Sequence, residues 1–363
     1  MAVIGVIVGL AGAMAALGSG SSSSPQTPAP IGPSATPTAG DEPPAETPPT
    51  LVQALLAATD DPAACVVSFE GEEVDLPPIL QSEGSLFDRL PIPQREGLVF
   101  AGWYATLADA AAYAVPARMN GSREVACTER QLTLYGAWTT PEANAAENAR
   151  IPIMMYHQFT AKPEGESGWT RGNHVYIGDF EAHMAYIAQD GFYFPTWDEL
   201  SAFIDGRLFL PNHSLIVTDD AADQTWFDLA VPIVDKYKVL TTSFMITAHR
   251  QDPPPSKYVL RRSHTHDMHQ PGANGDGQMV NWAAADIAAD LEASAAVLGA
   301  KEVVAYPFGH YNETAKQGVR QAGFELARTI EQGYVRIGSD KLALPCVRIS
   351  YGMGADALPG LIG

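Results

Sequence analysis

The stretch around which the chain is organised reads Arg261-Arg262-Ser263-His264-Thr265-His266-Asp267-Met268-His269. It places three histidines and one carboxylate within six residues. A buried strand or helix gains nothing from polar groups at this density, because each needs its own hydrogen-bond partner once it leaves water. The pattern therefore indicates a chemical site rather than a core element.

The best partner for these histidines lies upstream, in Leu215-Ile216-Val217-Thr218-Asp219-Asp220. This apolar run is typical of a buried strand, and it ends in two adjacent carboxylates. A strand that ends in two acids, followed later by a His264-x-x-x-x-His269 pair, predicts a mixed carboxylate and imidazole site for a divalent metal such as zinc.

Strand-like and helix-like segments alternate from Ile151 onward. The strand-like segments are 151–156, 215–218, 241–247 and 302–306, and the helical ones are 177–190, 226–237, 286–298 and 313–322. This alternation predicts a parallel α/β architecture, in which active sites collect at the C-terminal ends of the strands. Asp219, Asp220, His264 and the loop Tyr306-Pro307-Phe308-Gly309 all fall at such ends, which indicates a single site.

A smaller β-rich module precedes this domain, over residues 63–140. Strand-like segments at 65–69, 98–100 and 131–135 are separated by turn residues such as Asn120-Gly121. Within it, Gly97-Leu98-Val99-Phe100-Ala101-Gly102-Trp103-Tyr104 and Leu134-Tyr135-Gly136-Ala137-Trp138 resemble a bacterial cell-surface repeat of the Listeria–Bacteroides type. The resemblance implies a β-grasp-like spacer or adhesion module whose aromatic residues form its core.

The N-terminal part has a different composition. Residues 2–18 carry no charge, and residues 19–50 are rich in Ser, Pro, Thr and Ala with few large apolar side chains. We expect a signal or membrane anchor at 1–18 and a disordered stalk at 19–60, hence an extracellular or cell-surface protein with membrane anchoring through the N-terminus. The net charge of -20, from 42 acidic and 22 basic residues, argues against nucleic acid as a partner.

The chain contains three cysteines, Cys65, Cys127 and Cys346. No Cys-x-x-Cys spacing occurs, which excludes a zinc knuckle. Cys65 and Cys127 both lie in the small module and have the option of pairing in an exported protein, but the sequence alone does not decide this. Cys346 is expected to be buried as a small apolar residue.

Taken in order, the motifs of the larger domain resemble the polysaccharide deacetylases of carbohydrate esterase family 4, which share the nodulation-protein homology domain. The matching segments, within a domain placed at 151–355, are Ile151-Pro152-Ile153-Met154-Met155-Tyr156-His157, Val217-Thr218-Asp219-Asp220-Ala221, Ser263 to His269, and Ala305-Tyr306-Pro307-Phe308-Gly309. The histidine spacing resembles that of the poly-N-acetylglucosamine deacetylase branch. The resemblance implies a distorted (β/α) barrel.

The resemblance also implies roles for individual residues. Asp220, His264 and His269 would be ligands of a divalent metal, zinc with cobalt or nickel as alternatives, and Asp219 the general base. Three protein ligands leave a position for water, whose pKa the metal lowers. His266 and Asp267 would support the ligands, and a backbone N–H near Phe308 would stabilise the oxyanion. No other cofactor is expected.

The chain departs from the family pattern at several positions. Ala221 stands where the family has Gly, at a position that needs an unusual backbone angle, and Ala305 stands where it has Arg. The late Leu-x-His that supplies the general acid is absent, which leaves His157 or His266 as candidates. The histidines expected to be ordinary surface or loop residues are His174, His183, His213, His249 and His310.

Two functions remain open on this basis. The first is an exported metal-dependent hydrolase of carbon–nitrogen bonds that removes acetyl groups from an acetylated polysaccharide, chiefly N-acetylglucosamine units of peptidoglycan or exopolysaccharide, with O-deacetylation as a variant. The alternative is a catalytically decayed deacetylase fold that binds carbohydrate or mediates adhesion at the cell surface. Ala221, Ala305 and the missing acid motivate the alternative.

Overall fold

The computed structural model describes residues 49–189 and 191–363, and the chain separates into the units Met1–Pro48 and Pro49–Gly363. The predicted signal or anchor, and the predicted stalk up to residue 48, lie outside the described residues. Among the helices that the structure does describe, none is both long and apolar enough to cross a membrane.

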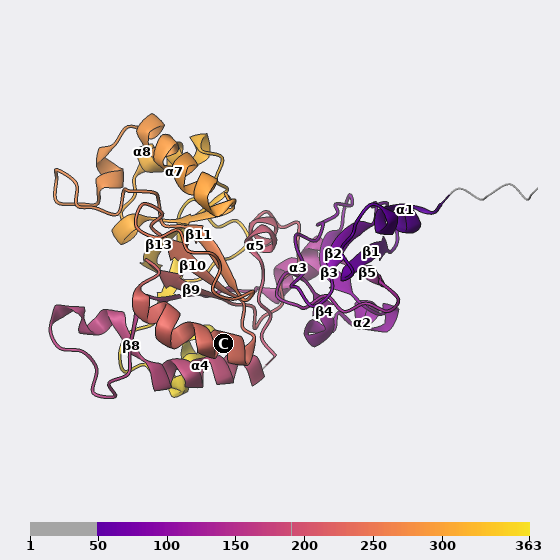
Figure 1. Cartoon of the computed structure of the whole chain (residues 1–363), viewed down its shortest axis with the longest axis horizontal. Coiled ribbons are helices and arrows are strands. Elements are labelled where there is room, and N and C mark those ends of the chain that lie inside the picture. The colour runs from indigo at the N-terminus through magenta and orange to yellow at the C-terminus, as the bar shows by residue number, and fades with distance from the viewer. Residues whose placement is uncertain (1–48, 190) are drawn as a thin grey trace, which may run out of the picture. The chain divides into compact units, whose positions relative to one another are not determined.

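A closed barrel forms the centre of the larger domain (Figure 1). Within the described residues it contains seven strands in the order β10-β11-β12-β13-β14-β6-β9. All neighbouring pairs are parallel, which confirms the predicted parallel α/β architecture. The strands are β6 (Ile153–Tyr156), β9 (Ile216–Asp220), β10 (Thr241–Met245), β11 (Val259–Ser263), β12 (Val303–Ala305), β13 (Leu326–Gln332) and β14 (Leu344–Arg348).

Four of these strands, β6, β9, β10 and β12, are buried on both faces, as expected for a parallel barrel that helices cover from outside. In β6, Ile153 and Met155 belong to one core while Met154 and Tyr156 belong to a second. Alternate residues of a strand point to opposite faces, so one short segment contributes to two cores. Each large apolar side chain buried in this way stabilises the fold by roughly 1.5–3 kcal/mol.

Helices cover the barrel from outside. Figure 1 shows α7 (Ala284–Leu298) and α8 (Glu313–Gln321) together on one side of the strands and α4 (Ile177–Gln189) on the other. The helix α6 (Val231–Tyr237) contacts α4. The remaining helices of this domain are α5 (Trp197–Ile204), whose Thr196 and Glu199 form a capping box, and α9 (Leu358–Ile362).

Short elements complete the domain. The strands β7 (Gln158–Thr160) and β8 (His174–Tyr176) pair with each other. Single turns of helix are η2 (Trp169–Asn173), η4 (Gln278–Asn281), η5 (Pro307–Gly309) and η6 (Ala355–Ala357). The predicted helix at 226–237 divides into a π-helical turn, η3 (Trp226–Ala230), and α6, and Pro232 lies at the junction.

The N-terminal module contains a mixed sheet in the order β2-β1-β5-β3-β4. The strands predicted within 63–140 are present, and the ring of Trp103 lies 4.7 Å from that of Phe69 and 5.0 Å from that of Phe100, inside the module's core. The β-grasp-like assignment stays a prediction. The elements are β1 (Ala64–Glu70), β2 (Ile79–Ser82), β3 (Val99–Tyr104), α2 (Leu107–Ala112), η1 (Val115–Ala117), β4 (Arg118–Met119), β5 (Gln131–Thr139) and α3 (Pro141–Glu147).

The last part of the predicted 19–60 stalk is helical, which corrects that prediction. The helix α1 spans Leu51–Ala57 and contacts β1 and β2. Thr50 and Gln53 form a capping box that satisfies two backbone N–H groups at its start. The local apolar residues and the cap together outweigh the low-complexity composition that precedes them.

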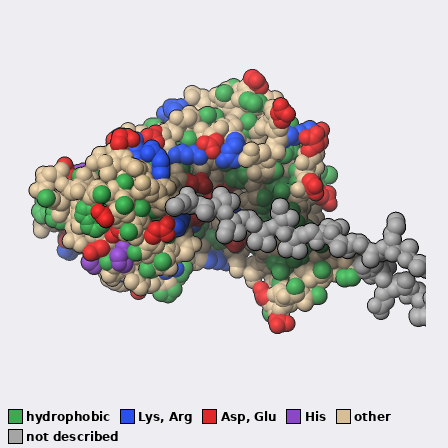
Figure 2. All heavy atoms as spheres, turned by 90° about the horizontal axis from the view of Figure 1, so that it is seen from above, with side chains coloured by type: hydrophobic (Ala, Val, Ile, Leu, Met, Phe, Trp, Pro, Cys, Tyr) green, Lys and Arg blue, Asp and Glu red, His purple; other side chains and the backbone are tan. Residues whose placement is uncertain are grey.

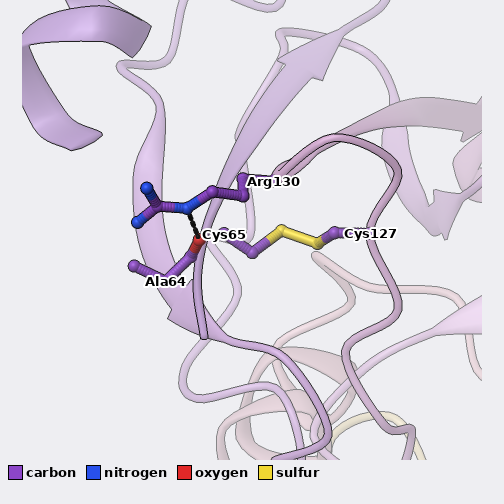
Figure 3. Close-up of a disulfide and its surroundings, with 4 residues drawn as sticks. All are labelled: Ala64, Cys65, Cys127 and Arg130. Carbon is purple, nitrogen blue, oxygen red and sulfur yellow. Dashed lines mark hydrogen bonds between the residues drawn. A yellow bond between two sulfur atoms is a disulfide. The ribbon is translucent and has the colours of Figure 1, made fainter. Parts of the chain in front are cut away.

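A disulfide joins Cys65, on β1, to Cys127 in the segment that leads into β5 (Figure 3). The two Cα atoms are 6.4 Å apart, within the usual range for a disulfide. Beside it, Arg130 donates a hydrogen bond of 2.9 Å from Nε to the carbonyl of Ala64. The pairing that the sequence left open is therefore made, and Cys346 is free and buried as expected.

The module and the barrel domain are joined by buried polar contacts. Arg118 is 1% exposed and donates a hydrogen bond of 2.7 Å to the carbonyl of Phe209, and its guanidinium lies 4.6 Å from the centre of the Tyr193 ring. Asn120 donates a hydrogen bond of 2.7 Å to Glu199. Buried polar groups of this kind require their partners, so the contact is specific.

Removal of the disulfide tests its contribution to stability. The bond closes a loop with a sequence separation of 62 residues. We expect the Cys65→Ala/Cys127→Ala double variant to lose roughly 2–4 kcal/mol of unfolding free energy, because the crosslink restricts the unfolded chain. Urea denaturation measures this loss, and wild-type protein in reductant should match the variant. Equal stability of oxidised wild type and variant would contradict the assignment.

The second prediction concerns pH. Glu124 accepts hydrogen bonds from Tyr258, from Lys238 at 3.0 Å, and ion-pairs with Lys257 at 3.3 Å. These partners lower its pKa from 4.5 to about 2. The carboxylate therefore stabilises the fold fully above pH 4.5, and progressively less as the pH falls toward about 2.

Thermal unfolding of Glu124→Gln between pH 7 and pH 2.5 measures this effect. The melting temperature should lie below that of wild type at pH 7, and the difference should shrink below pH 4.5. Glu96→Gln, at an exposed turn, is the matched control. A difference that stays constant with pH would show that the ionised carboxylate is not the cause.

Candidate active site

The residues singled out in the sequence meet at one end of the barrel. Asp219 and Asp220 are the last residues of β9, and His264 follows directly after β11. His157 follows β6, and Phe308 lies in η5 just after β12. Because the strands are parallel, all five residues lie at their C-terminal ends, where the sequence predicted a single site.

Asp220 is the most heavily contacted residue of this group. It is 4% exposed, and Oδ1 accepts an ion-paired hydrogen bond from Nη2 of Arg328. Oδ2 lies 3.8 Å from Nε2 of His157, beyond hydrogen-bond distance. Each carboxylate oxygen thus faces a different neighbour.

Arg328, on β13, was missed by the sequence analysis. Its side chain is fully buried, and Nη1 donates to the carbonyl of Thr329 and contacts Sδ of Met155, each at 3.0 Å. A buried guanidinium needs an anionic partner, because desolvation of an unpaired charge costs several kcal/mol. The signal was present in the sequence as a basic residue inside an apolar segment, Leu326 to Ile330.

The position of Arg328 relates to a departure noted in the sequence. Ala305 on β12 stands where the resembled family has arginine, and Arg328 is its register partner on β13. The guanidinium therefore enters the site from the neighbouring strand. The cation that the sequence suggested was missing is supplied one strand away.

The two adjacent aspartates have opposite shifts in pKa. Burial raises the pKa of Asp219 well above its ordinary value, and the charge of Asp220 adds to this. For Asp220, burial acts in the same direction, but Arg328, His157 and His264 outweigh it and hold the pKa below its ordinary value. Asp220 is therefore the carboxylate that its neighbours hold ionised, while the raised pKa of Asp219 makes it the stronger proton acceptor of the two.

Asp219 has one oxygen available for chemistry. Oδ2 accepts a hydrogen bond of 3.3 Å from the hydroxyl of Ser243, on β10. Oδ1 is buried and has no hydrogen-bond partner within the described part of the chain. A buried acceptor without a partner is costly, which marks this atom as a candidate for direct contact with a substrate or water.

His264 and His269 lie side by side, with ring centroids 4.7 Å apart. Nδ1 of His264 donates a hydrogen bond of 3.0 Å to the carbonyl of Ala305, which leaves Nε2 as the unprotonated nitrogen. Burial lowers the pKa of His264 to about 3 and also lowers that of His269. Both imidazoles are therefore neutral at pH 7, the form that binds metals.

The loop between these histidines is held by a helix behind it. Asp290 on α7 accepts hydrogen bonds from the backbone N–H of His266 at 2.6 Å and of Asp267 at 2.9 Å. The ring of His266 lies 3.0 Å from the hydroxyl of Thr247. Asp290 therefore holds this loop through its backbone, and the sequence analysis missed it. The supporting roles of His266 and Asp267 stay a prediction.

The side chains of this site are suitable metal ligands, but in the structure they are not arranged around one point. Two neutral imidazoles and one ionised carboxylate are ligands that zinc prefers, and Asp220 retains Oδ2 while Oδ1 binds Arg328. In residues 49–189 and 191–363, however, no group of three or more histidine, cysteine or acidic side chains is arranged to hold a metal ion. The site of Asp220, His264 and His269 stays a prediction.

The backbone beyond β9 has the unusual conformation expected from the sequence. Ala221 has a φ of 73° and Ala222 a φ of 48°, a region that favours glycine. Ala221 therefore keeps the turn of the family's glycine at some cost in strain, of order 1–2 kcal/mol. The turn directs the chain away from the barrel immediately after Asp220.

His157 and Phe308 complete the site. Burial lowers the pKa of His157, and the charge of Asp220 opposes this. Phe308 has a φ of 57°, and its ring centroid lies 4.3 Å from that of His269. Strained backbone of this kind persists where the surrounding structure demands it, often at functional sites.

One of the remaining histidines differs from the prediction. His183 was expected at the surface or in a loop, but it is fully buried on α4. Nδ1 accepts a hydrogen bond of 2.9 Å from the hydroxyl of Tyr156, and Nε2 donates one of 2.9 Å to the carbonyl of Met353. Both ring nitrogens are satisfied, so the polar ring is tolerated inside the apolar face of the helix.

Comparison with known proteins identifies relatives of one kind. No family model matches the chain. The poly-β-1,6-N-acetyl-D-glucosamine N-deacetylase of Staphylococcus aureus (strain MRSA252) is 27% identical over 192 residues, which are 47% of this chain and 66% of that enzyme. The YxkH protein of Bacillus subtilis (strain 168), provisionally named a polysaccharide deacetylase, is 23% identical over 239 residues, covering 62% of this chain and 79% of that protein.

Solved structures support the fold. The Streptococcus pyogenes deacetylase PplD in complex with acetate has a TM-score of 0.50 at 21% identity, and the match covers 60% of this chain and 99% of that one. BC0361, a polysaccharide deacetylase from Bacillus cereus, has a TM-score of 0.50 at 18% identity, covering 63% and 72%. The relatives and structural neighbours are polysaccharide deacetylases, and the chain shares their mixed α/β fold.

Replacement of Arg328 tests the buried ion pair. We expect Arg328→Met to lose roughly 3–5 kcal/mol of unfolding free energy at pH 7, measured by urea denaturation in chelator, because Asp220 is left as an unpaired buried charge. Arg328→Lys should retain part of this stability. The ionised Asp220 contributes fully to stability above pH 3.8, and this contribution is lost as the pH falls through its lowered pKa. The difference in unfolding free energy between wild type and Arg328→Met should therefore become smaller below pH 3.8.

Arg336→Met is the matched control, because this arginine is exposed and its guanidinium donates to the side chain of Asn148. It should change stability by no more than about 0.5 kcal/mol. If Arg328→Met were as stable as this control at pH 7, the ion pair would not make the predicted contribution to the unfolding free energy.

Proposed function

We propose that this chain is a metal-dependent polysaccharide N-deacetylase, which hydrolyses the acetamido groups of N-acetylglucosamine units in peptidoglycan or an exopolysaccharide. The observation that carries the proposal is that Asp219, Asp220 and His264 all lie at C-terminal ends of strands in a closed parallel barrel, with the ring of His269 beside that of His264. The similarity to a poly-β-1,6-N-acetyl-D-glucosamine N-deacetylase supports the choice of substrate class.

The proposed metal, zinc with cobalt and nickel as alternatives, would be held by Oδ2 of Asp220, Nε2 of His264 and the ring of His269. When bound, it would supply a Lewis acid that polarises the acetyl carbonyl and lowers the pKa of water. Arg328 fixes Oδ1 of the same carboxylate, so Asp220 presents its second oxygen in a defined direction. His264 is already in the tautomer that offers Nε2.

The remaining residues have proton-transfer roles in this proposal. Oδ1 of Asp219 takes a proton from water as the oxygen adds to the acetyl carbon, which makes Asp219 the general base. The protonated form of His157 gives a proton to the leaving nitrogen as the carbon–nitrogen bond breaks, so that acetate and a free amine result. The proton held by Asp219 then passes to His157 and restores the starting state. We favour His157 over His266 as the acid, because His157 faces Asp220 while His266 is bonded to Thr247.

The backbone N–H of Phe308 is proposed to donate to the oxyanion that forms on the acetyl oxygen. The strained conformation of Phe308 and its contact with His269 support a functional position for this residue. Export and anchoring through the N-terminus also remain part of the proposal, and the disulfide between Cys65 and Cys127 suits an oxidising compartment.

Acetate release tests the proposed activity. The purified protein, with and without added zinc or cobalt, is assayed on acetylated chito-oligomers, β-1,6-linked N-acetylglucosamine oligomers, peptidoglycan and acetylxylan. We expect metal-dependent release from the N-acetylated polymers, with a loss of at least about 100-fold in Asp219→Asn and Asp220→Ala, because each removes a group acting at the reacting atoms.

His213→Asn serves as the control, since this histidine lies in a loop before β9 and should leave the rate unchanged. Preferential release from acetylxylan would reassign the activity to O-deacetylation. Binding of the polymers without release under any metal condition would contradict the proposal and favour the carbohydrate-binding alternative.

A further inference from the structure

One exposed aromatic side chain near the site has no role in the chemistry proposed above. Trp169, in η2, is 93% exposed, more than any other large apolar residue in the described part of the chain. Tryptophan buries 150–250 Å² when covered, so its complete exposure forgoes a large stabilisation. Binding residues are often carried on connecting segments, so the position of this side chain relative to the site decides its role.

The segment that carries Trp169 begins at the site itself. It leaves β6 through His157, continues as β7, passes through η2 and enters β8, which runs parallel to β7. The backbone N–H of Phe159 on β7 donates to the hydroxyl of Thr225, which follows β9. The segment therefore lies over the C-terminal ends of β6 and β9, on the same face as Asp220.

A second anchor connects the segment with the charges around His157. Arg348, the last residue of β14, donates a hydrogen bond to the side chain of Asn173 at the end of η2. The charge of Arg348 also acts on the pKa of His157. Arg348 thus lies between the catalytic end of the barrel and the turn that presents Trp169.

The turn is held firmly on both sides of the tryptophan. Arg171 lies over the ring of Tyr351, 4.2 Å from its centre. Glu166 accepts hydrogen bonds from Thr160 at 2.7 Å and from Lys162 at 2.8 Å. Because these contacts fix the segment, the indole is presented in advance, which reduces the entropy lost on binding.

We propose that Trp169 is a stacking platform for a sugar ring of the substrate chain, at a subsite next to the reacting residue. This inference rests on the proposed function. The flat indole can stack on the C–H face of a pyranose ring. Every sugar of the polymer presents such a face, so the indole can bind any of them. The platform therefore favours an extended N-acetylhexosamine chain over a single sugar.

The charge of the segment supports a neutral chain rather than a lipid surface. Residues 161–173 contain two acidic and two basic side chains, and the whole chain has a net charge of -20. Attraction to anionic lipid requires a cluster of basic residues. In the view of Figure 2, acidic and basic side chains are interspersed on the visible surface.

Steady-state kinetics on oligomers of different length test the platform. Wild type, Trp169→Ala, Trp169→Phe and the exposed-residue control Leu107→Ala are compared on one- and six-sugar substrates with β-1,4 or β-1,6 linkages. We expect Trp169→Ala to raise KM for the hexamers about tenfold with little change in kcat, and to leave the monosaccharide unaffected. Trp169→Phe should retain most of the affinity, and the linkage with the larger effect identifies the polymer.

Binding is measured independently of turnover by the quenching of tryptophan fluorescence, with Asp219→Asn as the inactive background. Hexamers should quench the tryptophan emission of the Asp219→Asn variant. They should not quench that of the double variant Asp219→Asn/Trp169→Phe. Saturable quenching in this background, together with no acetate release by wild type under any metal condition, would retain the platform and reject the proposed function. Unchanged hexamer kinetics in a folded, active Trp169→Ala variant, or quenching only by phosphatidylglycerol vesicles, would overturn the platform.

Discussion

The buried ion pair between Arg328 and Asp220 is the constraint on which the site depends. A guanidinium and a carboxylate both withdrawn from water stabilise the fold only if they remain together, because each alone would cost several kcal/mol. The pair holds the pKa of Asp220 below its ordinary value, while burial raises that of the adjacent Asp219. It also occupies one oxygen of Asp220 and leaves the second facing His157. A core of apolar residues alone would serve stability as well, so the retention of the charges is best explained by chemistry.

The barrel supplies the remaining geometry through its strand ends. Parallel strands bring residues distant in sequence to one face, so His157, Asp220 and His264 lie at the same end of the barrel, each at the end of a different strand. Supporting contacts then fix each group: the carbonyl of Ala305 sets the tautomer of His264, and Asp290 holds the loop that follows it. Ala221 adopts a positive φ although it is not glycine, so the surrounding fold imposes the backbone conformation of the turn after Asp220.

Much of this arrangement could be predicted from the sequence, because periodicity and strand-end positions are local signals. The apolar run ending in Asp219 and Asp220, and the dense histidine stretch, identified the elements and the face of the barrel. Arg328 could not be paired from sequence, because its partner Asp220 lies on β9, which is not a neighbour of β13 in the barrel. The same holds for His183, whose burial depends on Tyr156 and Met353, and for α1, where a capping box outweighs the composition of the preceding segment.

The central claim is that Asp220, His264 and His269 form one metal site at the end of the barrel, and calorimetric titration of zinc into the metal-free protein tests it most directly. The account predicts one equivalent bound by wild type at pH 7, proton release as the pH is lowered toward the pKa values of the ligands, and loss of binding in His264→Ala but not in His310→Ala. No zinc binding by the folded wild type, or binding that His264→Ala leaves unchanged, would contradict it.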